Sequence, residues 1–348
     1  MTPSSLNVCT ADDDRWLTFV ASQPEATLFH HPAWSQVLAD CYGHRVLALV
    51  QTDAANEIVA GVPLVEMRGT FGGRRFVSLP FTDYCPPLAN TSANLALLAK
   101  NLVNWRDTKG GRVIAVHSAL PDAPGVHHVT RAVRHVLPLG RTSKQVLQEL
   151  NASRMRGIRK AQRLGVQASL SQSAADLPAF YRLHLETRRR LGVPVQPMRF
   201  LEALWKSVVL RGLGFVVFAY KDGRPIAAAL FLAWNGTLIY KFGASDPRYW
   251  ELRPNNLVIG TAIDWACQHG YGLLDFGKTD LGNQGLRDFK SRWGSIEIPL
   301  VNSYIGQSPP RSMPRLPSWA MTKVIRSSPP IVCRALGELL YGRIGTVA

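Results

Sequence analysis

The stretch FVVFAYKDGRPIAAALFLAWNGTLIYKFG, residues 215–243, determines how the second half of this chain folds. It holds three runs of strand-forming residues, at 215–220, 226–234 and 237–243. The turn sequences Lys221-Asp222-Gly223-Arg224 and Asn235-Gly236 separate these runs, and Asn-Gly between apolar runs is a strong signal for a two-residue hairpin turn. The stretch therefore predicts an antiparallel meander of three strands.

The segments around this meander predict a mixed α/β (α+β) fold that occurs twice. Before the meander, periodicity predicts helices at 143–164, 174–191 and 198–210 and a strand at 166–170. After it we expect a helix at 256–269, a strand at 273–276, a short helix at 286–293 and a last strand at 296–304. The first half shows the same order, with helices at 12–22, 31–42 and 93–108, strands at 45–51, 57–65, 76–79 and 112–116, and a connection at 119–140. We therefore expect two modules built alike, each with a mixed, mostly antiparallel sheet.

The charge of the chain is concentrated in its second half. The 348 residues carry 40 Lys and Arg against 24 Asp and Glu, a formal net charge of +16. Residues 1–140 hold 11 basic and 11 acidic residues, whereas residues 141–348 hold 29 and 13 and so carry the whole excess. This asymmetry predicts an anionic partner for the second half, such as nucleic acid, a phosphorylated substrate or an anionic membrane.

Composition excludes several classes of protein. Hydrophobic residues make up 46% of the chain, which is typical of a globular protein. The longest apolar runs, such as 226–234, are about half the ~20 residues of a membrane-spanning helix. The N-terminus lacks the basic and apolar layout of a signal peptide. The five dispersed cysteines read as reduced thiols, so we expect a cytoplasmic protein.

The predicted helix at 143–164 is amphipathic with a basic face. Leu147, Leu150, Met155, Ile158 and Ala161 form its apolar stripe, and the cations of the opposite face are Arg156, Arg159, Lys160 and Arg163. Only Glu149 is acidic here, so neighbouring acids cannot neutralise this face. The basic face is either a solvated surface or a site of phosphate contact. The second interpretation is also supported by a further basic cluster, formed by Arg182, Arg188, Arg189 and Arg190.

The sequence shows no pattern typical of a metal site or of several other enzyme classes. The nine histidines do not converge on a metal-binding spacing, so we expect no metal site. No G-x-S-x-G, Walker loop or G-x-G-x-x-G occurs, which argues against hydrolase, P-loop and Rossmann functions.

The segment from Leu273 to Gly294 is the best candidate for catalytic chemistry. It begins with the apolar strand Leu273-Leu274-Asp275-Phe276-Gly277 and continues into a short helix that contains Phe289 and Lys290. A Lys at the end of a buried strand could stabilise an oxyanion without proton transfer. Without further information, an exposed Lys on a short helix is the favoured reading of Lys290.

These residues carry a family resemblance. The chain resembles the Fem-type peptidyl (aminoacyl) transferases and their FemAB-like relatives in the GNAT acyltransferase superfamily, over roughly residues 25–305. The matching text includes Arg156-Gly157-Ile158-Arg159-Lys160-Ala161, Pro254-Asn255-Asn256-Leu257, Asp275-Phe276-Gly277 and Phe289-Lys290-x-x-Trp293-Gly294. In the first half, 29–34 and 79–84 also match. Within the family the chain is most similar to the FemAB-related proteins of exopolysaccharide and protein-sorting loci.

The resemblance implies two tandem GNAT-like domains. The first would span 1–140, completed by a returning strand at about 296–305, and the second would span 141–295. A basic, Pro-rich tail would follow at 306–348.

The resemblance also implies an activity, which is transfer of an acyl or aminoacyl group to an amine in cell-envelope or exopolysaccharide biosynthesis. Lys290 would then be catalytic and Phe289 would shape its pocket. Asp83 and Tyr84 would belong to the acceptor cleft, and the expected contacts to the remaining substrate groups are Arg156, Arg159, Lys160, Tyr240 and Asn255.

The donor stays open between aminoacyl-tRNA and acyl-CoA, with no tightly bound cofactor, and the phosphate-bearing donor or acceptor that the basic half would bind is tRNA, CoA or a nucleotide- or lipid-linked sugar. No long coiled-coil insertion is present to grip tRNA, and no glycine-rich turn precedes the predicted helix at 256–269 to grip CoA. Arg253 and the N-terminus of that helix could still attract phosphate. The alternatives are an acyl-CoA-dependent N-acyltransferase acting on an amino sugar or amine, and a non-catalytic scaffold.

The tail contains two amphipathic pieces, at 319–325 and 331–344. They could lie on an anionic membrane surface or pack on the body of the protein, and packing is the favoured reading. We expect a monomeric protein, cytoplasmic or peripheral at the inner membrane.

Overall fold

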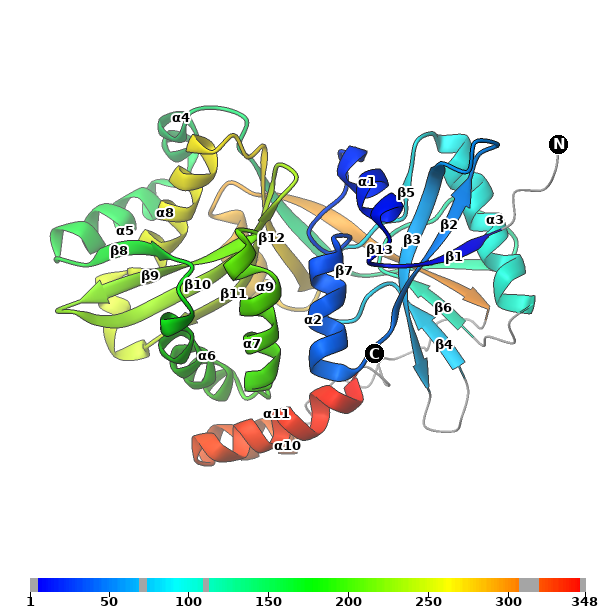
Figure 1. Cartoon of the computed structure of the whole chain (residues 1–348). Coiled ribbons are helices and arrows are strands. Elements are labelled where there is room, and N and C mark those ends of the chain that lie inside the picture. Colours follow the sequence, from blue (N-terminus) through cyan, green and yellow to red (C-terminus); the bar gives the residue numbers. More distant parts are fainter. Residues whose placement is uncertain (1–5, 69–73, 109–112, 307–318, 345–348) are drawn as a thin grey trace. The chain divides into compact units, whose positions relative to one another are not determined.

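The computed structural model describes residues 6–68, 74–108, 113–306 and 319–344 (Figure 1). Its chain forms two compact units. Unit 1 comprises 1–133 and 299–313 with the last residues from 343, and unit 2 comprises 134–298 and 314–342. The chain passes between the units within the two long strands β7 (Val126–Pro138) and β13 (Ile296–Gly306).

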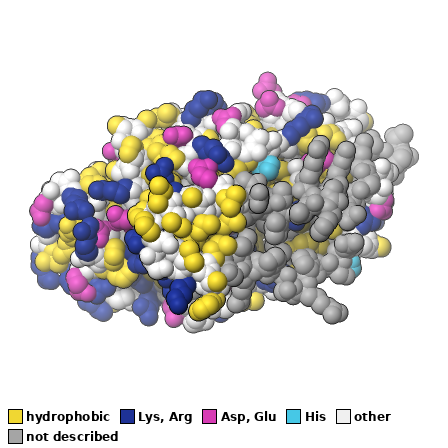
Figure 2. All heavy atoms as spheres, turned by 90° about the horizontal axis from the view of Figure 1, so that it is seen from below, with side chains coloured by type: hydrophobic (Ala, Val, Ile, Leu, Met, Phe, Trp, Pro, Cys, Tyr) yellow, Lys and Arg dark blue, Asp and Glu magenta, His cyan; other side chains and the backbone are white. Residues whose placement is uncertain are grey.

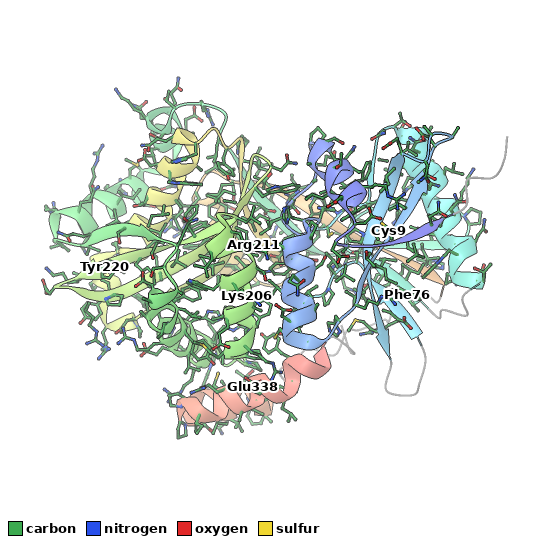
Figure 3. The ribbon with its side chains drawn as sticks, viewed as in Figure 1. Cys9, Phe76, Lys206, Arg211, Tyr220 and Glu338 are labelled. Atoms are coloured by element: carbon green, nitrogen blue, oxygen red, sulfur yellow. The ribbon has the colours of Figure 1, made fainter. Side chains whose placement is uncertain are left out.

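Unit 1 is a mixed sheet with three helices. Its strands are β1 (Asn7–Thr10), β2 (Val46–Thr52), β3 (Ile58–Arg68), β4 (Arg74–Val77), β5 (Leu88–Ala89) and β6 (Val113–Val116). Their order is β1-β2-β3-β4-β6-β13, with β5 paired to β3, and only β4 and β6 are described as a parallel pair. The helices are α1 (Asp14–Ser22), α2 (Pro32–Tyr42) and α3 (Ser92–Thr108). Aromatic packing fixes α3 on the sheet, since Trp105 of α3 meets Phe76 of β4 edge-on with ring centroids 4.7 Å apart. Figure 3 labels Phe76.

Unit 2 is a sheet with the order β7-β12-β11-β10-β9-β8. Its remaining strands are β8 (Gln167–Ser171), β9 (Gly214–Lys221), β10 (Arg224–Trp234), β11 (Thr237–Ser245) and β12 (Leu273–Asp280). The predicted meander is confirmed as β9-β10-β11, with left-handed Asp222 and Gly223 in one turn and left-handed Asn235 and Gly236 in the other. β12 joins β11 in parallel.

Helices cover both faces of the sheet of unit 2. They are α4 (Ser143–Glu149), α5 (Ala152–Arg163), α6 (Leu177–Leu191), α7 (Met198–Ser207), α8 (Pro254–Gln268) and α9 (Gln284–Ser291), followed by α10 (Trp319–Ser327) and α11 (Pro330–Ile344). Short 3-10 turns lie at 174–176, 209–211 and 247–252. Ala227, Ala229 and Phe231 of β10 belong to the core under α5 and α8. Their neighbours Ala228 and Leu230 are also buried, so β10 is covered on both sides.

Several elements differ from the sequence predictions, and the strands β1 and β5 were not predicted at all. The predicted helix at 143–164 is two helices, because Leu150 is extended and Asn151 caps a new helix by accepting a hydrogen bond from Ser153 N. The predicted connection at 119–140 contains the thirteen-residue strand β7. The His and Pro residues of that segment obscure the pattern of a strand, because its buried apolar residues occur only near its end.

The remaining boundaries shift by a few residues. β12 extends to Asp280, beyond the predicted end at 276, and α9 begins at Gln284 rather than at 286. The predicted tail pieces are the helices α10 and α11. No helix among the described residues is both long enough and apolar enough to cross a membrane.

Candidate active site

β11 and β12 separate after a short paired stretch. Thr237–Ile239 pair with Leu273–Asp275, but β11 runs on to Ser245 and β12 to Asp280 without further pairing between them. A register shift in the β10–β11 pairing leaves Lys241 unmatched at this point. Tyr240 and Phe276 face each other across the divergence, with ring centroids 6.0 Å apart.

The left-handed Gly277 bends β12 where it leaves β11. Asp275, 2% exposed, accepts hydrogen bonds from Gly277 N at 2.7 Å and from Arg134 Nε at 2.8 Å. Both oxygens of its carboxylate therefore support the bend, and Gly277 takes a φ of 71° that favours glycine. Asp275 thus has a structural role, which is to hold the end of the strand.

Lys290 secures the same bend from α9. Its side chain is 3% exposed, and Nζ donates to Gly277 O at 2.9 Å and to Lys278 O at 3.0 Å. The ammonium group is therefore engaged with the backbone of β12. The interpretation of Lys290 as an exposed Lys is wrong, because the bend in β12 supplies buried carbonyls that a cation can satisfy.

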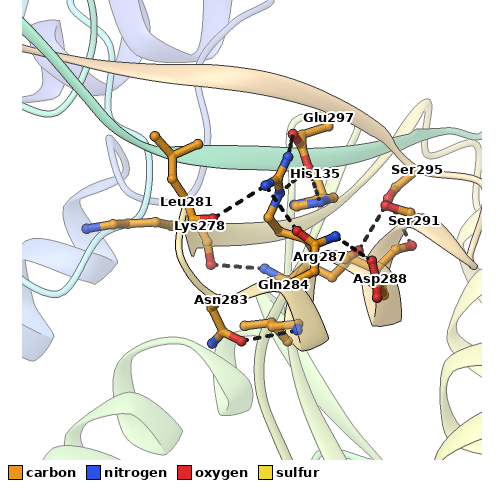
Figure 4. Close-up of polar contacts among 12 residues, drawn as sticks. His135, Lys278, Leu281, Asn283, Gln284, Arg287, Asp288, Ser291, Ser295 and Glu297 are labelled. Carbon is orange, nitrogen blue, oxygen red and sulfur yellow. Dashed lines mark hydrogen bonds and ion pairs between the residues drawn. The ribbon is translucent and has the colours of Figure 1, made fainter.

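α9 is itself held by a polar network (Figure 4). Arg287 donates to both oxygens of Glu297, at 2.9 and 2.7 Å, and Glu297 lies 3.2 Å from His135 Nε2. Asn283 caps the helix by accepting from Leu286 N, and Ser295 donates to Lys290 O. Burial, followed by the charge of Lys290, lowers the pKa of His135, so this ring stays neutral at pH 7.

A strongly basic cleft lies between α5 and the first turn of α8. Its larger cavity has a volume of about 400 Å³, and the described residues that line it include no acid; they are Ser153, Arg154, Arg156, Gly157, Lys160, Arg253, Asn256 and Arg292. A second cavity of about 210 Å³ shares Arg154, Arg253 and Asn256 and adds Trp250, Pro254, Asn255 and Phe289. One cation of the cleft, Lys160, forms an ion pair with an acid. Its Nζ lies 3.7 Å from the carboxylate of Glu251, whose side chain is 88% exposed. We call these two cavities together the basic cleft.

Close packing brings α5 and α8 together at this cleft. A Cβ added to Gly157 would lie 2.2 Å from Asn256 Nδ2, so only glycine permits the observed approach. Asn256 Nδ2 also lies 3.4 Å from Arg154 O. Arg253 precedes α8 in a left-handed conformation and makes no side-chain cap to it. The positive end of α8 therefore faces a cleft already rich in cations.

Arg154 occupies the centre of the cleft. It is partly buried, and its guanidinium lies 5.2 Å from the ring centroid of Phe289 and 5.4 Å from that of Trp293. Burial, followed by the charges of Arg292 and Arg253, lowers the pKa of Arg154. A bound anion would relieve this repulsion.

The structure brings together some of the predicted site residues. Arg156, Lys160, Asn255 and Phe289 line the basic cleft, and Asn255 Nδ2 also contacts Ser245 Oγ at 3.3 Å. The exposed Arg159 lines neither cavity.

The other predicted residues lie elsewhere. Tyr240 packs at the strand divergence, and burial raises the pKa of its hydroxyl to about 12. Asp83 and Tyr84 belong to unit 1, in the loop after β4 that contains left-handed Leu79 and Phe81. Trp250 and Arg292 were not expected from the sequence, because nothing in their local pattern marks them. Among the described residues, no group of three or more His, Cys, Asp and Glu side chains could hold a metal ion.

Comparisons with known proteins place the fold among known ones. Residues 152–291 match the acetyltransferase (GNAT) domain family. The fold of the chain is similar to that of FemX, with a TM-score of 0.69 at 14% identity over 86% of this chain and 97% of that one. It is also similar to L-PGS from Bacillus licheniformis, with a TM-score of 0.57 at 14% identity over 94% and 98% of the two chains.

A third solved structure is a tandem GNAT protein from the clavulanic acid biosynthesis pathway, with a TM-score of 0.51 at 13% identity over 88% of this chain and 100% of that one. No curated protein sequence matches the chain. Residues 152–291 thus match a GNAT domain family, and the fold of the chain is similar to those of FemX and of a tandem GNAT protein. The predicted fold class and the FemAB-like resemblance are confirmed at this level.

Proposed function

We propose that the protein transfers an acyl or aminoacyl group from a phosphate-bearing donor to an amine, and that the basic cleft holds the donor's phosphate. The observation that carries this proposal is the position of five cations, Arg154, Arg156, Lys160, Arg253 and Arg292, around the positive end of α8. The end of β11 lies next to this cleft, because Ser245, its last residue, contacts Asn255 at the start of α8. If the phosphate of the donor binds in this cleft, the donor lies close to the point where β11 and β12 diverge.

The reaction is an acyl substitution. The amine nitrogen attacks the donor carbonyl, a C–N bond forms, and the C–O bond of an ester or the C–S bond of a thioester breaks. The amine loses a proton, which the departing alkoxide or thiolate takes up. Such a reaction needs the two reactants held in place and the developing oxyanion stabilised, and it needs no strong base on the protein if the leaving group accepts the proton.

Lys290 acts in this proposal as a positioning residue. Its Nζ fixes the carbonyls of Gly277 and Lys278, and its helix presents Phe289 to the basic cleft. Lys290 therefore sets the shape of the end of β12 and the wall of the donor site together. The direct contact with an oxyanion that the sequence suggested would require Nζ to give up one of these carbonyls.

Two donors fit this cleft, aminoacyl-tRNA and acyl-CoA, because both join an adenosine and phosphate to an activated acyl group. The resemblance to FemAB-like proteins of exopolysaccharide loci favours an acceptor amine in the cell envelope, and Asp83 and Tyr84 are our candidates for its binding. An amino sugar acylated from acyl-CoA is the second candidate reaction. It is favoured by the match of residues 152–291 to the acetyltransferase domain family.

A matched pair of variants tests the donor site. Arg156 and Arg159 are both exposed arginines on α5, but only Arg156 lines the cleft. We expect Arg156→Ala to weaken binding of inorganic pyrophosphate about tenfold, as for loss of one charged contact. Arg159→Ala should change it less than twofold. Isothermal titration at low salt gives both constants, and equal effects of the two variants would contradict the assignment of the cleft.

Turnover tests the reaction itself. The purified protein is mixed with glucosamine and either labelled aminoacyl-tRNA or labelled acyl-CoA, and transfer of label to the amine is measured. We expect one donor to be consumed with amide formation, and Arg156→Ala to slow its use more than Arg159→Ala. A protein that binds pyrophosphate yet uses neither donor with glucosamine or a cell-envelope amine fraction would support the scaffold alternative.

A further inference from the structure

Trp250 is an exposed aromatic residue held rigidly at the edge of the basic cleft. It is 45% exposed, although large apolar side chains are usually buried. Its indole Nε1 donates to Ser245 Oγ at 3.0 Å, which fixes the orientation of the ring. The same hydroxyl oxygen lies 3.3 Å from Asn255 Nδ2, so the ring is tied to the start of α8.

Arg190 supports the ring of Trp250 from α6. Its guanidinium carbon lies 4.6 Å from the ring centroid of Trp250, and its NH1 donates to Ser245 O at 3.1 Å. Ser245 N and O are also bonded to the Thr187 hydroxyl, one turn earlier on α6. Ser245, Arg190 and Trp250 therefore form a built unit, and Trp250, which is 45% exposed, also lines the smaller cavity of the basic cleft.

We propose that Trp250 is a stacking platform for the nucleobase of the donor. This inference rests on the proposed function and names the part of the donor that lies next to its phosphate. Aromatic rings bind nucleobases by stacking, and a cation near the ring adds to the attraction. Trp250 lines the same small cavity as Arg154 and Arg253, so one ligand can place its phosphate on the arginines and its base on the indole.

The platform predicts a preference for adenosine phosphates over phosphate alone. We expect adenosine 3′,5′-bisphosphate to bind at least about fivefold more tightly than inorganic pyrophosphate. Trp250→Ala should abolish that preference and leave pyrophosphate affinity within twofold. Trp250→Phe should retain most of the preference, because it keeps an aromatic face. Arg253→Ala should weaken the binding of both ligands. Thermal melting verifies that each variant is folded.

The outcomes separate this inference from the proposed function. Equal affinity of the native protein for the two ligands, or an unchanged preference in Trp250→Ala, would overturn the platform while leaving the anion site intact. Binding of neither ligand would overturn both.

A different observation supports a second inference, about α10 and α11. These helices pack on α6 through buried Ile325, Cys333 and Tyr341, and Arg189 Nε donates to Ser328 O at 2.7 Å. Their outer side nevertheless exposes large apolar side chains: Trp319 by 79%, Ile331 by 70%, Leu339 by 52% and Val324 by 48%. Figure 2 shows hydrophobic side chains gathered on this face of the molecule, with Lys and Arg at the margins.

The charges around this apolar face are positive. Lys323 lies 5.5 Å from the ring centroid of Trp319 and lines a shallow groove with Arg326. The only acid in 319–344 is Glu338, which is paired with Arg199 Nη1 at 2.8 Å (Figure 3 labels Glu338). Exposed Trp, Ile and Leu bordered by Lys and Arg are what an anionic lipid surface attracts.

We infer that α10 and α11 dock on an anionic membrane surface with Trp319 and Ile331 inserted among the lipids. The native protein should float with vesicles that contain about one third phosphatidylglycerol and should not float with pure phosphatidylcholine. The double variant Trp319→Ser, Ile331→Ser should reduce binding at least about tenfold, since it removes two large insertions. Leu210→Ser, which changes a 56% exposed apolar residue on another part of unit 2, should have no effect.

Two results would overturn the membrane inference. One is equal flotation of the double variant and the native protein, or no flotation at all. The other is a native dimer in sedimentation that the double variant breaks, which would show that a second copy covers this face.

Discussion

At the scale of single residues, Gly157 decides whether the basic cleft can form. A Cβ placed on Gly157 would lie 2.2 Å from Asn256 Nδ2 of α8. The approach lets Arg156 and Lys160 of one helix face Arg253 and Asn256 of the other. The amide of Asn256 cannot retreat freely, because it also contacts Arg154 O.

We therefore predict that Gly157→Ala disturbs both stability and anion binding. The added methyl group must push Asn256 away, and overpacking of this kind costs about 1–3 kcal/mol of the free energy of unfolding. Pyrophosphate affinity should fall with it. Gly285→Ala is the control, since a Cβ there has no neighbour within 4 Å and should be neutral or slightly stabilising. Urea unfolding and titration measure the two effects, and unchanged behaviour of Gly157→Ala would mean that α8 can shift at no cost.

The cleft shows how far a sequence pattern reaches at this scale. The spacing of Arg156 and Lys160 placed both on a basic face, and both line the cleft. The break at Leu150–Asn151 was not expected, and it separates the basic half of the predicted helix as α5. Trp250 and Arg292 come from distant parts of the chain and share no motif with α5, so only the fold could bring them to this cleft.

At the scale of elements, the link between α9 and β12 determines the shape of the site. The sequence predicted a strand ending in Asp-Phe-Gly and a helix with Phe-Lys, but it did not show that the Lys binds the end of the strand. That contact depends on the left-handed turn at Gly277, which exposes the carbonyls of Gly277 and Lys278 to Nζ. β7 was missed for a similar reason, because its role in the sheet depends on pairing with β12 rather than on its own composition.

We predict that Lys290→Met destabilises the protein by about 2–4 kcal/mol. The variant keeps the volume of the side chain but leaves two buried carbonyls without their charged donor, and part of the loss is offset because a charge is no longer buried. Lys278→Met is the control: Lys278 is exposed, so its effect should stay within about 0.5 kcal/mol. Urea unfolding of both variants measures this. A Lys290→Met protein of native stability that has lost acyl transfer would instead assign Lys290 a direct catalytic role.

At the scale of the whole molecule, buried histidines make stability depend on pH. His30 of unit 1 accepts a hydrogen bond from Thr27 N at Nδ1, and its Nε2 lies 2.8 Å from Pro86 O. Burial lowers the pKa of His30 to about 4. His184 of unit 2 contacts Gln196 Oε1 at Nε2 and stacks on Phe180, and burial lowers its pKa to about 3. Both rings are therefore neutral in the folded protein at pH 7.

The direction of the effect follows from these lowered values. In the unfolded chain His30 and His184 take up protons near pH 6.5, whereas in the folded protein these two side chains do so only at about pH 4 or below. Stability is therefore complete above pH 6.5 and is lost as pH falls toward 4. Each histidine contributes about 2 kcal/mol of loss between pH 7.5 and pH 5. Carboxylates with a lowered pKa, such as Asp13 and Glu297, change stability only at pH values below their ordinary pKa near 4. They therefore do not contribute between pH 7.5 and pH 5.

We predict that His184→Gln flattens this dependence. The variant should be less stable than the native protein at pH 7.5, because it disturbs a packed ring, but it should lose about 2 kcal/mol less on going to pH 5. His127→Gln alters an exposed histidine and should leave the dependence unchanged. Urea unfolding of the three proteins at both pH values measures the differences, and because His184 lies in unit 2 the flattening should appear in the transition of that unit. An unchanged dependence in His184→Gln would mean that His184 gains its proton without unfolding, and that the space around its Nδ1 admits a water or a counter-charge when the pH falls.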